Sequence, residues 1–366
     1  MKILFISGNL TGGGAQRVIS VVASELAERG HDVSLLLFAR NEKEYPLSDK
    51  VKRTALSASF AEYERVSLPS RLLAVRRYLK VNKPDVAVGF LEGGYALHLA
   101  SFGMKHIKKV ASARIDPKII MREKGIRGTI NRAWFRHADA VVLQTPAQAE
   151  HVDARMKKRS LVIANPVSER ALDAKKSTHA SSCRHFVMAG RLADQKNYPM
   201  VFRAVASLKA EHPDLQVDIF GKEEGGATKK IKAEIEERSL FDRVRLCGWS
   251  QDTVGEYAAA DAYILSSNYE GMPNALMEAM AVGLPCISTD CETGPRDLIT
   301  HGEDGFLIPV DDDVALAAYM RRVMEMSAEE RAAMGDRAHE KMKNEFSRER
   351  IADQWEQLFC SLTEEK

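Results

Sequence analysis

Two glutamates with seven residues between them are the first feature of this chain that could do chemistry. Glu270 follows an apolar run in "YILSSNYEGMPNALME", and Glu278 closes the same stretch. Because Pro273 forbids helix before it and suits a first turn, a helix should start there. Its N-terminal N–H groups would attract an anion. The two carboxylates would then bracket a phosphate, one contacting sugar hydroxyls and the other a ribose diol. Alternatively, Glu270 is only a turn residue and Glu278 lies on an exposed helix face.

Two cations follow another apolar run, in "FVMAGRLADQKNYPM". Arg191 comes directly after the predicted strand, and Lys196 precedes a helix predicted to begin near Asn197. Cations held at the end of a strand suit a diphosphate, because Arg offers a forked contact and Lys a point charge. The alternative is a pair of ordinary surface cations.

A run of three glycines, Gly12 to Gly14, follows the first apolar run in "SGNLTGGGAQRVI". Glycines there let backbone N–H groups approach a phosphate or sugar, next to a helix N-terminus. A nicotinamide fingerprint is a rival, but its glycine spacing fails, and Glu42 comes too late to be its acidic residue. A simple flexible turn is the other alternative.

These loops need parallel sheets to position them, and the apolar pattern predicts two. Runs that are continuously apolar alternate with segments of helical spacing, which indicates doubly wound α/β domains with strands buried on both faces. We predict a cleft between the two domains, at the carboxyl ends of the strands. The predicted domains are residues 1–168, 169–346 and a final helix, 347–366, with a polar linker between Pro166 and Arg184. The predicted strands are "KILFIS", "VSLLLF", "VAVGF", "KVASA", "AVVLQT", "LVIAN", "HFVMAG", "QVDIFG", "VRLCG", "AYILSS", "PCIST" and "GFLIP".

Composition favours a folded cytoplasmic protein. The 366 residues are 45% hydrophobic and 28% charged, and no apolar run is long enough to span a bilayer. The N-terminal "MKILFISGNL" fits a first strand better than a signal peptide. Five scattered cysteines are typical of reduced thiols, and no set of His and Cys completes a zinc site, so we expect no metal.

The charge is unevenly distributed. Residues 1–165 hold 28 Lys and Arg against 15 Asp and Glu, whereas the remainder is net acidic. From Lys105 to Arg136 there are ten basic residues against two acidic ones. Such a segment suits an anionic membrane surface and a lipid diphosphate, although it could simply be a solvated helix face. The loops around Glu270, Arg191 and Gly12 together predict a site for a nucleoside diphosphate sugar, and nucleic acid is not expected beside such a site. The apolar residues interleaved with these charges are Ile119, Ile120, Met121, Ile126, Ile130, Trp134 and Phe135.

Taken together, these segments resemble the retaining glycosyltransferases of family 4, the group 1 glycosyltransferases with the GT-B fold. The segments that carry the resemblance are "GGGAQRVI", "IANPV", "AGRLADQKNYPMVFRAV", "LSSNYEGMPNALMEAMAVGLPCISTDCETGPRDLI" and "GEDGFLIPVDD", and it covers essentially the whole chain. It looks closest to bacterial enzymes that build lipid-linked oligosaccharides, lipopolysaccharide or capsule. The resemblance implies an N-terminal acceptor domain, a C-terminal donor domain, and a last helix that crosses back onto the first domain.

The resemblance also implies roles for individual residues. Glu270 would contact the donor sugar, Glu278 the ribose, and Arg191 with Lys196 the diphosphate. One departure is that many relatives carry a His after the fourth N-terminal strand, where this chain has "ASARIDP"; Arg114 and Asp116 would touch donor or acceptor instead. The other residues implied in donor binding are Gly13, Gly14, Gly271, Met272, Pro273, Asn274, Ala275 and Leu276, with Trp249 and Ser250 near the nucleobase.

The expected activity is transfer of a hexose or N-acetylhexosamine from a UDP-sugar, with retention and without a metal ion or other cofactor. The expected acceptor is a glycan on a lipid diphosphate, reached by peripheral contact with the inner face of the cell membrane. A sugar-nucleotide epimerase or a hydrolase on the same scaffold is the alternative. A non-catalytic carbohydrate-binding protein is a further one, but Arg191 and Lys196 would then be hard to explain.

Overall fold

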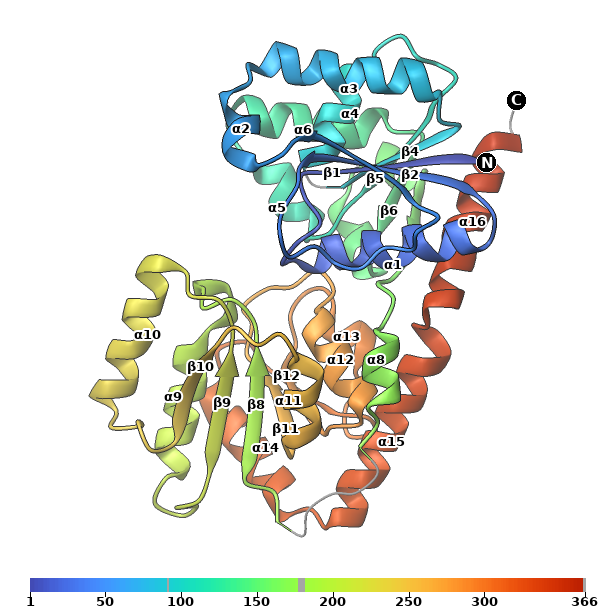
Figure 1. Cartoon of the computed structure of the whole chain (residues 1–366). Helices are drawn as coiled ribbons and strands as arrows, with labels where there is room; N and C mark the ends of the chain where they lie inside the picture. Colours follow the sequence, from blue (N-terminus) through green and yellow to red (C-terminus); the bar gives the residue numbers. More distant parts are fainter. Residues whose placement is uncertain (91, 177–181, 365–366) are drawn as a thin grey trace. The chain divides into compact units, whose positions relative to one another are not determined.

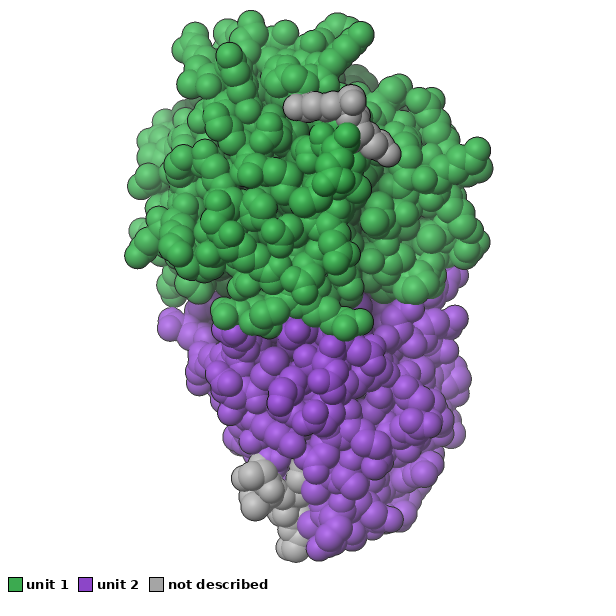
Figure 2. All heavy atoms as spheres, turned by 90° about the vertical axis from the view of Figure 1, so that its right-hand side faces the viewer, with its two compact units in different colours: residues 1–166, 348–366 green, residues 167–347 purple. Residues whose placement is uncertain are grey.

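The structure, a computed structural model, describes residues 1–90, 92–176 and 182–364 (Figure 1). The chain divides into two compact units: unit 1 is Met1–Pro166 with Arg348–Lys366, and unit 2 is Val167–Ser347 (Figure 2). The sequence-based boundaries, 168/169 and 346/347, differ from these by two residues and by one.

The predicted linker between Pro166 and Arg184 is wrong in part. Residues Glu169–Asp173 form the short helix α8, whose Ala171 is fully buried. This helix packs against helices of unit 2, so the segment is part of that unit. Residues 177–181 of the predicted linker lie outside the described residues.

Unit 1 is built on a parallel sheet of seven strands in the order β3-β2-β1-β4-β5-β6-β7. The order reverses direction between β1 and β4, as in a doubly wound fold. The strands are β1 (Lys2–Ser7), β2 (Asp32–Ala39), β3 (Lys52–Ser57), β4 (Val86–Phe90), β5 (Lys108–Ser112), β6 (Ala140–Leu143) and β7 (Ser160–Val162). The helices are α1 (Gly14–Glu28), α2 (Phe60–Arg65), α3 (Leu68–Asn82), α4 (Glu92–Ala100), α5 (Pro117–Arg122), α6 (Gly125–His137), η1 (Ala147–His151), α7 (Ala154–Lys157) and α16 (Arg348–Glu364).

Alternation along the buried strands divides the core of unit 1 into two layers. Ile3 and Phe5 of β1 pack with α1 and α16, whereas Leu4 and Ile6 pack with α3, α4 and α6. Side chains on successive strand residues point to opposite faces, so a strand buried on both faces must be apolar throughout. Figure 1 shows helices on both sides of this sheet.

The last helix, α16, completes one face of unit 1. Ile351, Trp355, Leu358 and Phe359 are buried in the layer that contains α1, and the Trp355 ring lies 6.3 Å from that of Phe90. The i, i+4, i+7, i+8 spacing of these residues places them on one helix face. Polar contacts at the edge of this face come from Arg29 on α1, which forms ion pairs with Asp353 and Glu356.

Unit 2 repeats the architecture with six parallel strands in the order β10-β9-β8-β11-β12-β13. Here the direction reverses between β8 and β11. The strands are β8 (His185–Ala189), β9 (Gln216–Phe220), β10 (Val244–Gly248), β11 (Ala262–Leu265), β12 (Cys286–Thr289) and β13 (Phe306–Ile308). Besides α8, the helices are η2 (Asp194–Lys196), α9 (Tyr198–Leu208), α10 (Gly225–Glu237), α11 (Thr253–Ala259), α12 (Asn274–Val282), α13 (Pro295–Leu298), α14 (Asp313–Glu325) and α15 (Ala328–Glu345).

The prediction of two Rossmann-like α/β units with parallel sheets is confirmed. Every strand pair within the described ranges is parallel, and each of the twelve predicted runs overlaps a strand. The sequence reading missed β3, "KRTALS", because this edge strand is half exposed and lacks an apolar run. No helix in the described part of the chain is long and apolar enough to cross a bilayer.

Candidate functional site

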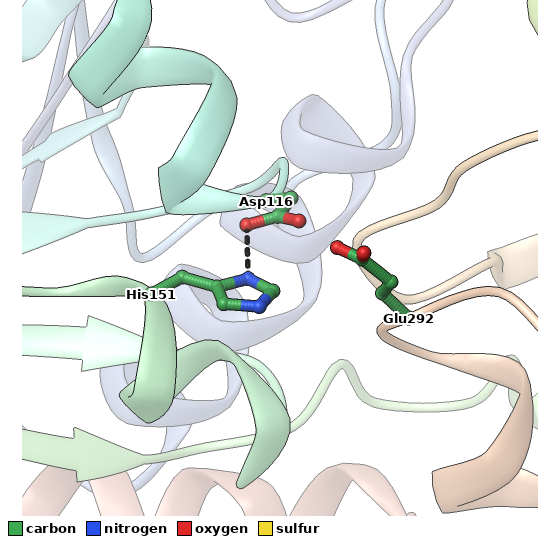
Figure 3. A group of neighbouring side chains, drawn as sticks. All are labelled: Asp116, His151 and Glu292. Atoms are coloured by element: carbon green, nitrogen blue, oxygen red, sulfur yellow. Dashed lines mark hydrogen bonds and ion pairs between the residues drawn. The ribbon is translucent and has the colours of Figure 1, made fainter.

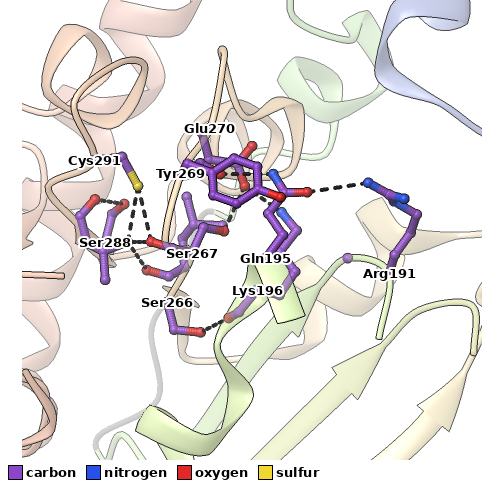
Figure 4. Close-up of polar contacts among 12 residues, drawn as sticks. Arg191, Gln195, Lys196, Ser266, Ser267, Tyr269, Glu270, Ser288 and Cys291 are labelled. Atoms are coloured by element: carbon purple, nitrogen blue, oxygen red, sulfur yellow. Dashed lines mark hydrogen bonds and ion pairs between the residues drawn. The ribbon is translucent and has the colours of Figure 1, made fainter. Parts of the chain in front are cut away.

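The central feature of unit 2 is an ion pair between Lys196 and Glu270. Lys196 follows β8 and Glu270 follows β11, and the Nζ–Oε1 distance is 2.7 Å (Figure 4). These two strands are neighbours at the point where the strand order reverses, and ligands of open α/β sheets bind outside the carboxyl ends there. Both side chains are largely buried, so the pair is weakly screened by solvent.

Gly190 explains how Lys196 reaches this position. A Cβ atom at Gly190 would lie only 2.6 Å from Cε of Lys196, so any other residue would displace the lysine stem. Gly221 is equally constrained, because its Cβ would lie 1.7 Å from the Gly190 carbonyl oxygen. The glycine before Arg191 therefore serves close packing around the cation.

Glu270 is held by hydrogen bonds to its side chain and its backbone. The Ser267 hydroxyl donates to Oε1 at 2.7 Å, and the Thr293 hydroxyl donates to the Glu270 carbonyl oxygen. The Ser267 carbonyl in turn accepts from Thr289 at 2.7 Å. Burial, with a smaller contribution from the Glu270 charge, raises the pKa of Tyr198, whose hydroxyl donates to the Gly190 carbonyl. The carboxylate is thus fixed in a packed, polar-lined setting.

Arg191 lies on the exposed side of the same loop. Its guanidinium forms an ion pair of 2.8 Å with Glu224 and donates to Gln195 Oε1 at 3.3 Å. Gln195 also donates to the Tyr269 carbonyl, one residue before Glu270 (Figure 4). The structure therefore links both predicted cations to the glutamate loop, Lys196 directly and Arg191 through Gln195.

The helix after Glu270 starts where the sequence predicts it. Pro273 is the N-cap residue of α12, and the first intrahelical hydrogen bond comes from the Met277 N–H. The N–H groups of the three preceding residues thus lie at the positive end of the helix dipole. Glu278 lies further along the same helix and is half-buried. Gly283 ends the helix in the left-handed conformation, with φ at 87°.

The two residues predicted near the nucleobase lie after β10. Trp249 is about half exposed, and the Lys222 ammonium lies 5.5 Å from its ring centroid. Ser250 donates to Glu256 and accepts from the Asp252 N–H. An exposed indole beside a cation offers a stacking surface for a base, and the assignment stays a prediction.

In unit 1, the glycine run precedes helix α1 as predicted. Gly13 is its N-cap residue, with no side-chain cap, and Gly12 has a φ of 70°. A Cβ at Gly13 would lie 2.3 Å from Gln16 Oε1, so the Gln16 side chain closes over the glycine. The loop follows β1, at the reversal point of this sheet. The roles of Gly13 and Gly14 in donor binding stay predictions.

Arg114 and Asp116, which replace the expected His, are both buried but have different partners. Arg114 donates to the Ser112 hydroxyl and to Asn165 Oδ1, and its guanidinium lies 4.8 Å from the Phe90 ring centroid. Burial lowers the pKa of Arg114 to about 9. Asp116 caps α5 through the Lys118 N–H.

Asp116 also contacts a histidine that the sequence reading missed. The distance from His151 Nδ1 to Asp116 Oδ1 is 2.7 Å (Figure 3). His151 is at the end of η1, 35 residues further along the chain, so it is brought in by the adjacency of the loops after β5 and β6. This adjacency places an imidazole in the neighbourhood where relatives were expected to carry one.

The basic segment from Lys105 to Arg136 is only partly the surface that the sequence predicts. Ile119 and Ile126 are exposed, 41% and 82%. Trp134 and Phe135 are buried, so the prediction that they stud a surface is wrong. They lie on the inner face of α6, which packs against α4, and a Cβ at Gly94 would collide with the Trp134 ring.

Other residues that support the site were missed because their types are common in any loop. Ser267, Gln195 and Thr293 hold the Glu270 loop, and Asn165 holds Arg114. All four residues lie in segments that carry the family resemblance, such as "IANPV" for Asn165, and that resemblance is the signal that could have found them.

Together, the described residues of unit 2 offer a buried carboxylate, two cations and a helix N-terminus on the loops that follow β8 and β11. Carboxylates accept hydrogen bonds from sugar hydroxyls, whereas cations and helix N-termini bind phosphate. The arrangement can therefore hold a molecule that carries both sugar hydroxyls and phosphates, and it can stabilise negative charge on those phosphates.

Comparisons with known proteins agree with this chemistry. The chain is 26% identical over 354 residues to "Lipopolysaccharide core biosynthesis glycosyltransferase LpsE" of Rhizobium meliloti, covering 95% of this chain and 96% of the relative. It is 27% identical over 373 residues to a Campylobacter jejuni "GalNAc-alpha-(1->4)-GalNAc-alpha-(1->3)-diNAcBac-PP-undecaprenol alpha-1,4-N-acetyl-D-galactosaminyltransferase", covering 99% of each.

Solved structures share the fold. Anabaena Alr3699/HepE in complex with UDP-glucose superposes with a TM-score of 0.81 at 18% identity, covering 99% of this chain and 100% of that one. Two family models match in succession: "Glycosyl transferase 4-like domain" over residues 13–166 and "Glycosyl transferases group 1" over residues 169–341. The chain is therefore a glycosyltransferase with the GT-B fold and belongs to the group 1 glycosyltransferases.

Proposed function

We propose that this enzyme transfers a hexose or N-acetylhexosamine from a UDP-sugar, with retention, to a glycan carried on a lipid diphosphate. The observation that carries the donor half is the Lys196–Glu270 ion pair at the strand-order reversal of unit 2. A sugar diphosphate offers hydroxyls for the carboxylate and phosphates for the cation. The names of the relatives support the setting, because they include lipopolysaccharide core synthesis and an acceptor on PP-undecaprenol.

The proposed mechanism follows from the charge that develops during transfer. Breaking the bond between the anomeric carbon and oxygen leaves negative charge on the departing diphosphate. Lys196, Arg191 and the N-terminus of α12 would stabilise this charge in the transition state. With these groups in place, we expect no divalent cation to be needed.

Glu270 is proposed to position the sugar and is not proposed to attack it. Its Oε1 atom already receives hydrogen bonds from Lys196 and Ser267, which lowers its nucleophilicity. In the proposed reaction the acceptor hydroxyl forms the new bond on the face that the diphosphate leaves, and its proton passes to the leaving phosphate. Glu278 would bind the ribose hydroxyls from α12.

The test is transfer in the presence and absence of EDTA, with a panel of UDP-sugars and a saccharide on a lipid diphosphate. We expect a glycosylated lipid, free UDP and a product whose anomeric configuration, read by NMR, matches that of the donor. Activity should be unchanged by EDTA. Release of free sugar alone, an epimerised nucleotide sugar, or an inverted linkage would contradict the proposal.

We also propose peripheral contact with an anionic membrane through the exposed part of the basic segment. Arg122, Lys124 and Arg127 are exposed and flank the exposed apolar side chains of Ile119 and Ile126. Cations beside apolar side chains suit a headgroup layer with negative charge.

Sedimentation with vesicles measures this contact. We expect the enzyme to pellet with vesicles rich in phosphatidylglycerol, to remain in the supernatant with neutral phosphatidylcholine, and to be released as salt rises. Binding that salt does not weaken, or no binding to either vesicle, would rule the contact out.

A further inference from the structure

Unit 1 contains a cavity of about 560 Å³ at the carboxyl edge of its sheet. It is lined by residues of α4, α5 and α6 and by the end of β5. Its volume falls in the range of small-molecule sites. The lining is mainly apolar, with Ile115, Ile119, Ile120, Trp134 and Phe135 among its residues.

Arg114 is a buried cation in this lining. The Arg114 side chain lines the cavity and is 8% exposed, and among the described residues no carboxylate forms an ion pair with it. Its hydrogen bonds to the described chain go to the Ser112 hydroxyl, twice, and to Asn165 Oδ1 at 2.7 Å. A guanidinium carries five N–H groups, so two remain for a ligand. A buried charge is costly unless it is paired, and an anion in the cavity would supply the pairing.

Some of the other charged side chains around the cavity already have partners in the described chain, and one does not. Arg127 lies 3.4–3.5 Å from Glu123 and Glu92, and Asn131 donates to Glu123, so these carboxylates already have partners. Arg122 is exposed and forms no ion pair within the described residues. Arg114 and Arg122 are therefore the two cations that an anionic ligand would find available.

A second cavity of about 430 Å³ shares Glu92 and Tyr95 with the first. It reaches Gly8, Asn9 and Gln16 after β1, where the strand order of this sheet reverses. Its lining is more polar than that of the first cavity. The first cavity thus offers apolar side chains and a cation at the end of β5, and the second offers a lining of mixed polar and apolar side chains.

We propose that the apolar cavity binds the prenyl diphosphate part of the acceptor, with Arg114 and Arg122 on the diphosphate and the first isoprene units against Ile119, Ile120 and Trp134. The glycan of the acceptor would then occupy the second cavity. This inference rests on the proposed function and names the part of the acceptor that the enzyme binds. The cavity accepts only the first units of a long lipid, so the remainder would stay in the membrane.

Binding can be measured without transfer, by calorimetric titration with farnesyl diphosphate, farnesol and inorganic pyrophosphate. Saturating UDP is present throughout, so that the proposed donor site is occupied. We expect farnesyl diphosphate to bind at least tenfold more tightly than either farnesol or pyrophosphate, because only it fills both the apolar and the cationic parts. Equal affinity for farnesyl diphosphate and pyrophosphate would overturn the proposal.

Substitutions test the apolar and the cationic parts of the cavity separately. Arg114→Gln should weaken binding of farnesyl diphosphate about tenfold, the effect of losing a charge-assisted contact, and leave farnesol unchanged. Ile119→Asp, at an exposed position, should weaken farnesol as well as farnesyl diphosphate, because it places a charge in the apolar part of the cavity. Arg122→Glu should weaken only the diphosphates. The matched control is Arg155→Glu on α7, which makes the same charge change outside the cavity and should bind every probe as the wild type does.

Arg114 also bridges Ser112 and Asn165, so its replacement could loosen the fold. Thermal unfolding of Arg114→Gln detects this, and the exposed Ile119→Asp and Arg122→Glu variants test the proposal if it occurs. Wild-type affinity for farnesyl diphosphate in all three variants would refute the site. If farnesyl diphosphate binds as expected but no sugar reaches a lipid-linked acceptor, the proposed function fails and the binding site stands. If transfer to that acceptor proceeds with an unchanged KM in all three variants, the function stands and the site fails.

Discussion

Glu270→Gln is expected to lower kcat by about 10²–10³ and to leave the fold intact. The substitution keeps the shape of the side chain but removes the charge that faces Lys196 at 2.7 Å. Loss of a preorganised charged contact to the reacting group costs on this scale. The measurement is steady-state release of UDP and formation of product, together with the midpoint of thermal unfolding.

Glu223→Gln provides the matched control. Glu223 is an exposed glutamate of unit 2 that also pairs with a lysine, Lys232, at 2.9 Å. Exposed pairs contribute little, so its kinetics should stay within twofold of the wild type. A Glu270→Gln enzyme with a kcat near that of the wild type would remove Glu270 from the catalytic machinery, whatever its effect on stability.

The sequence predicted the positions of Arg191, Lys196 and Glu270 on loops after strands better than it predicted their pairing. Arg191, Lys196 and Glu270 each follow an apolar run, which is enough to place them on loops at the carboxyl ends of parallel strands. The pairing of Lys196 with Glu270 depends on β8 and β11 being neighbours, although 74 residues separate the two side chains. Strand order is set by the packing of the whole sheet, and a local pattern does not contain it.

The dependence on neighbouring elements also explains which features of unit 1 the sequence did not predict correctly. Edge strand β3 is stabilised by pairing with β2, so its own residues need not be apolar. Trp134 and Phe135 sit among cations in the sequence, yet α6 turns them inward onto α4. His151 and Asn165 meet Asp116 and Arg114 only because the loops after neighbouring strands come together. The residues of each segment can be read from the sequence, but the exposure of a segment is determined by the elements that pack against it.

Within unit 2, the Lys196–Glu270 ion pair is expected to have an electrostatic role and a structural role, and replacing Lys196 should affect both. Lys196→Ala should lower kcat by about 10²–10³, because it removes the cation proposed to stabilise the leaving diphosphate, and it should also weaken binding of UDP. It leaves Glu270, 9% exposed, without its ion-pair partner. An uncompensated buried charge should therefore lower the free energy of unfolding by about 1–3 kcal/mol.

The double variant Lys196→Ala with Glu270→Gln decides which loss matters for turnover. A neutral amide needs no cation, so the double variant should recover most of the stability that Lys196→Ala loses. Its turnover should be lower than that of Glu270→Gln alone, because the cation for the diphosphate is missing as well. Urea unfolding and kcat measured on the same four proteins complete the cycle. Lys232→Ala, which breaks the exposed pair with Glu223, should change neither quantity appreciably. If the double variant turns over as fast as Glu270→Gln alone, Lys196 acts only by holding Glu270 in place; if it is slower, the charge of Lys196 acts on the substrate.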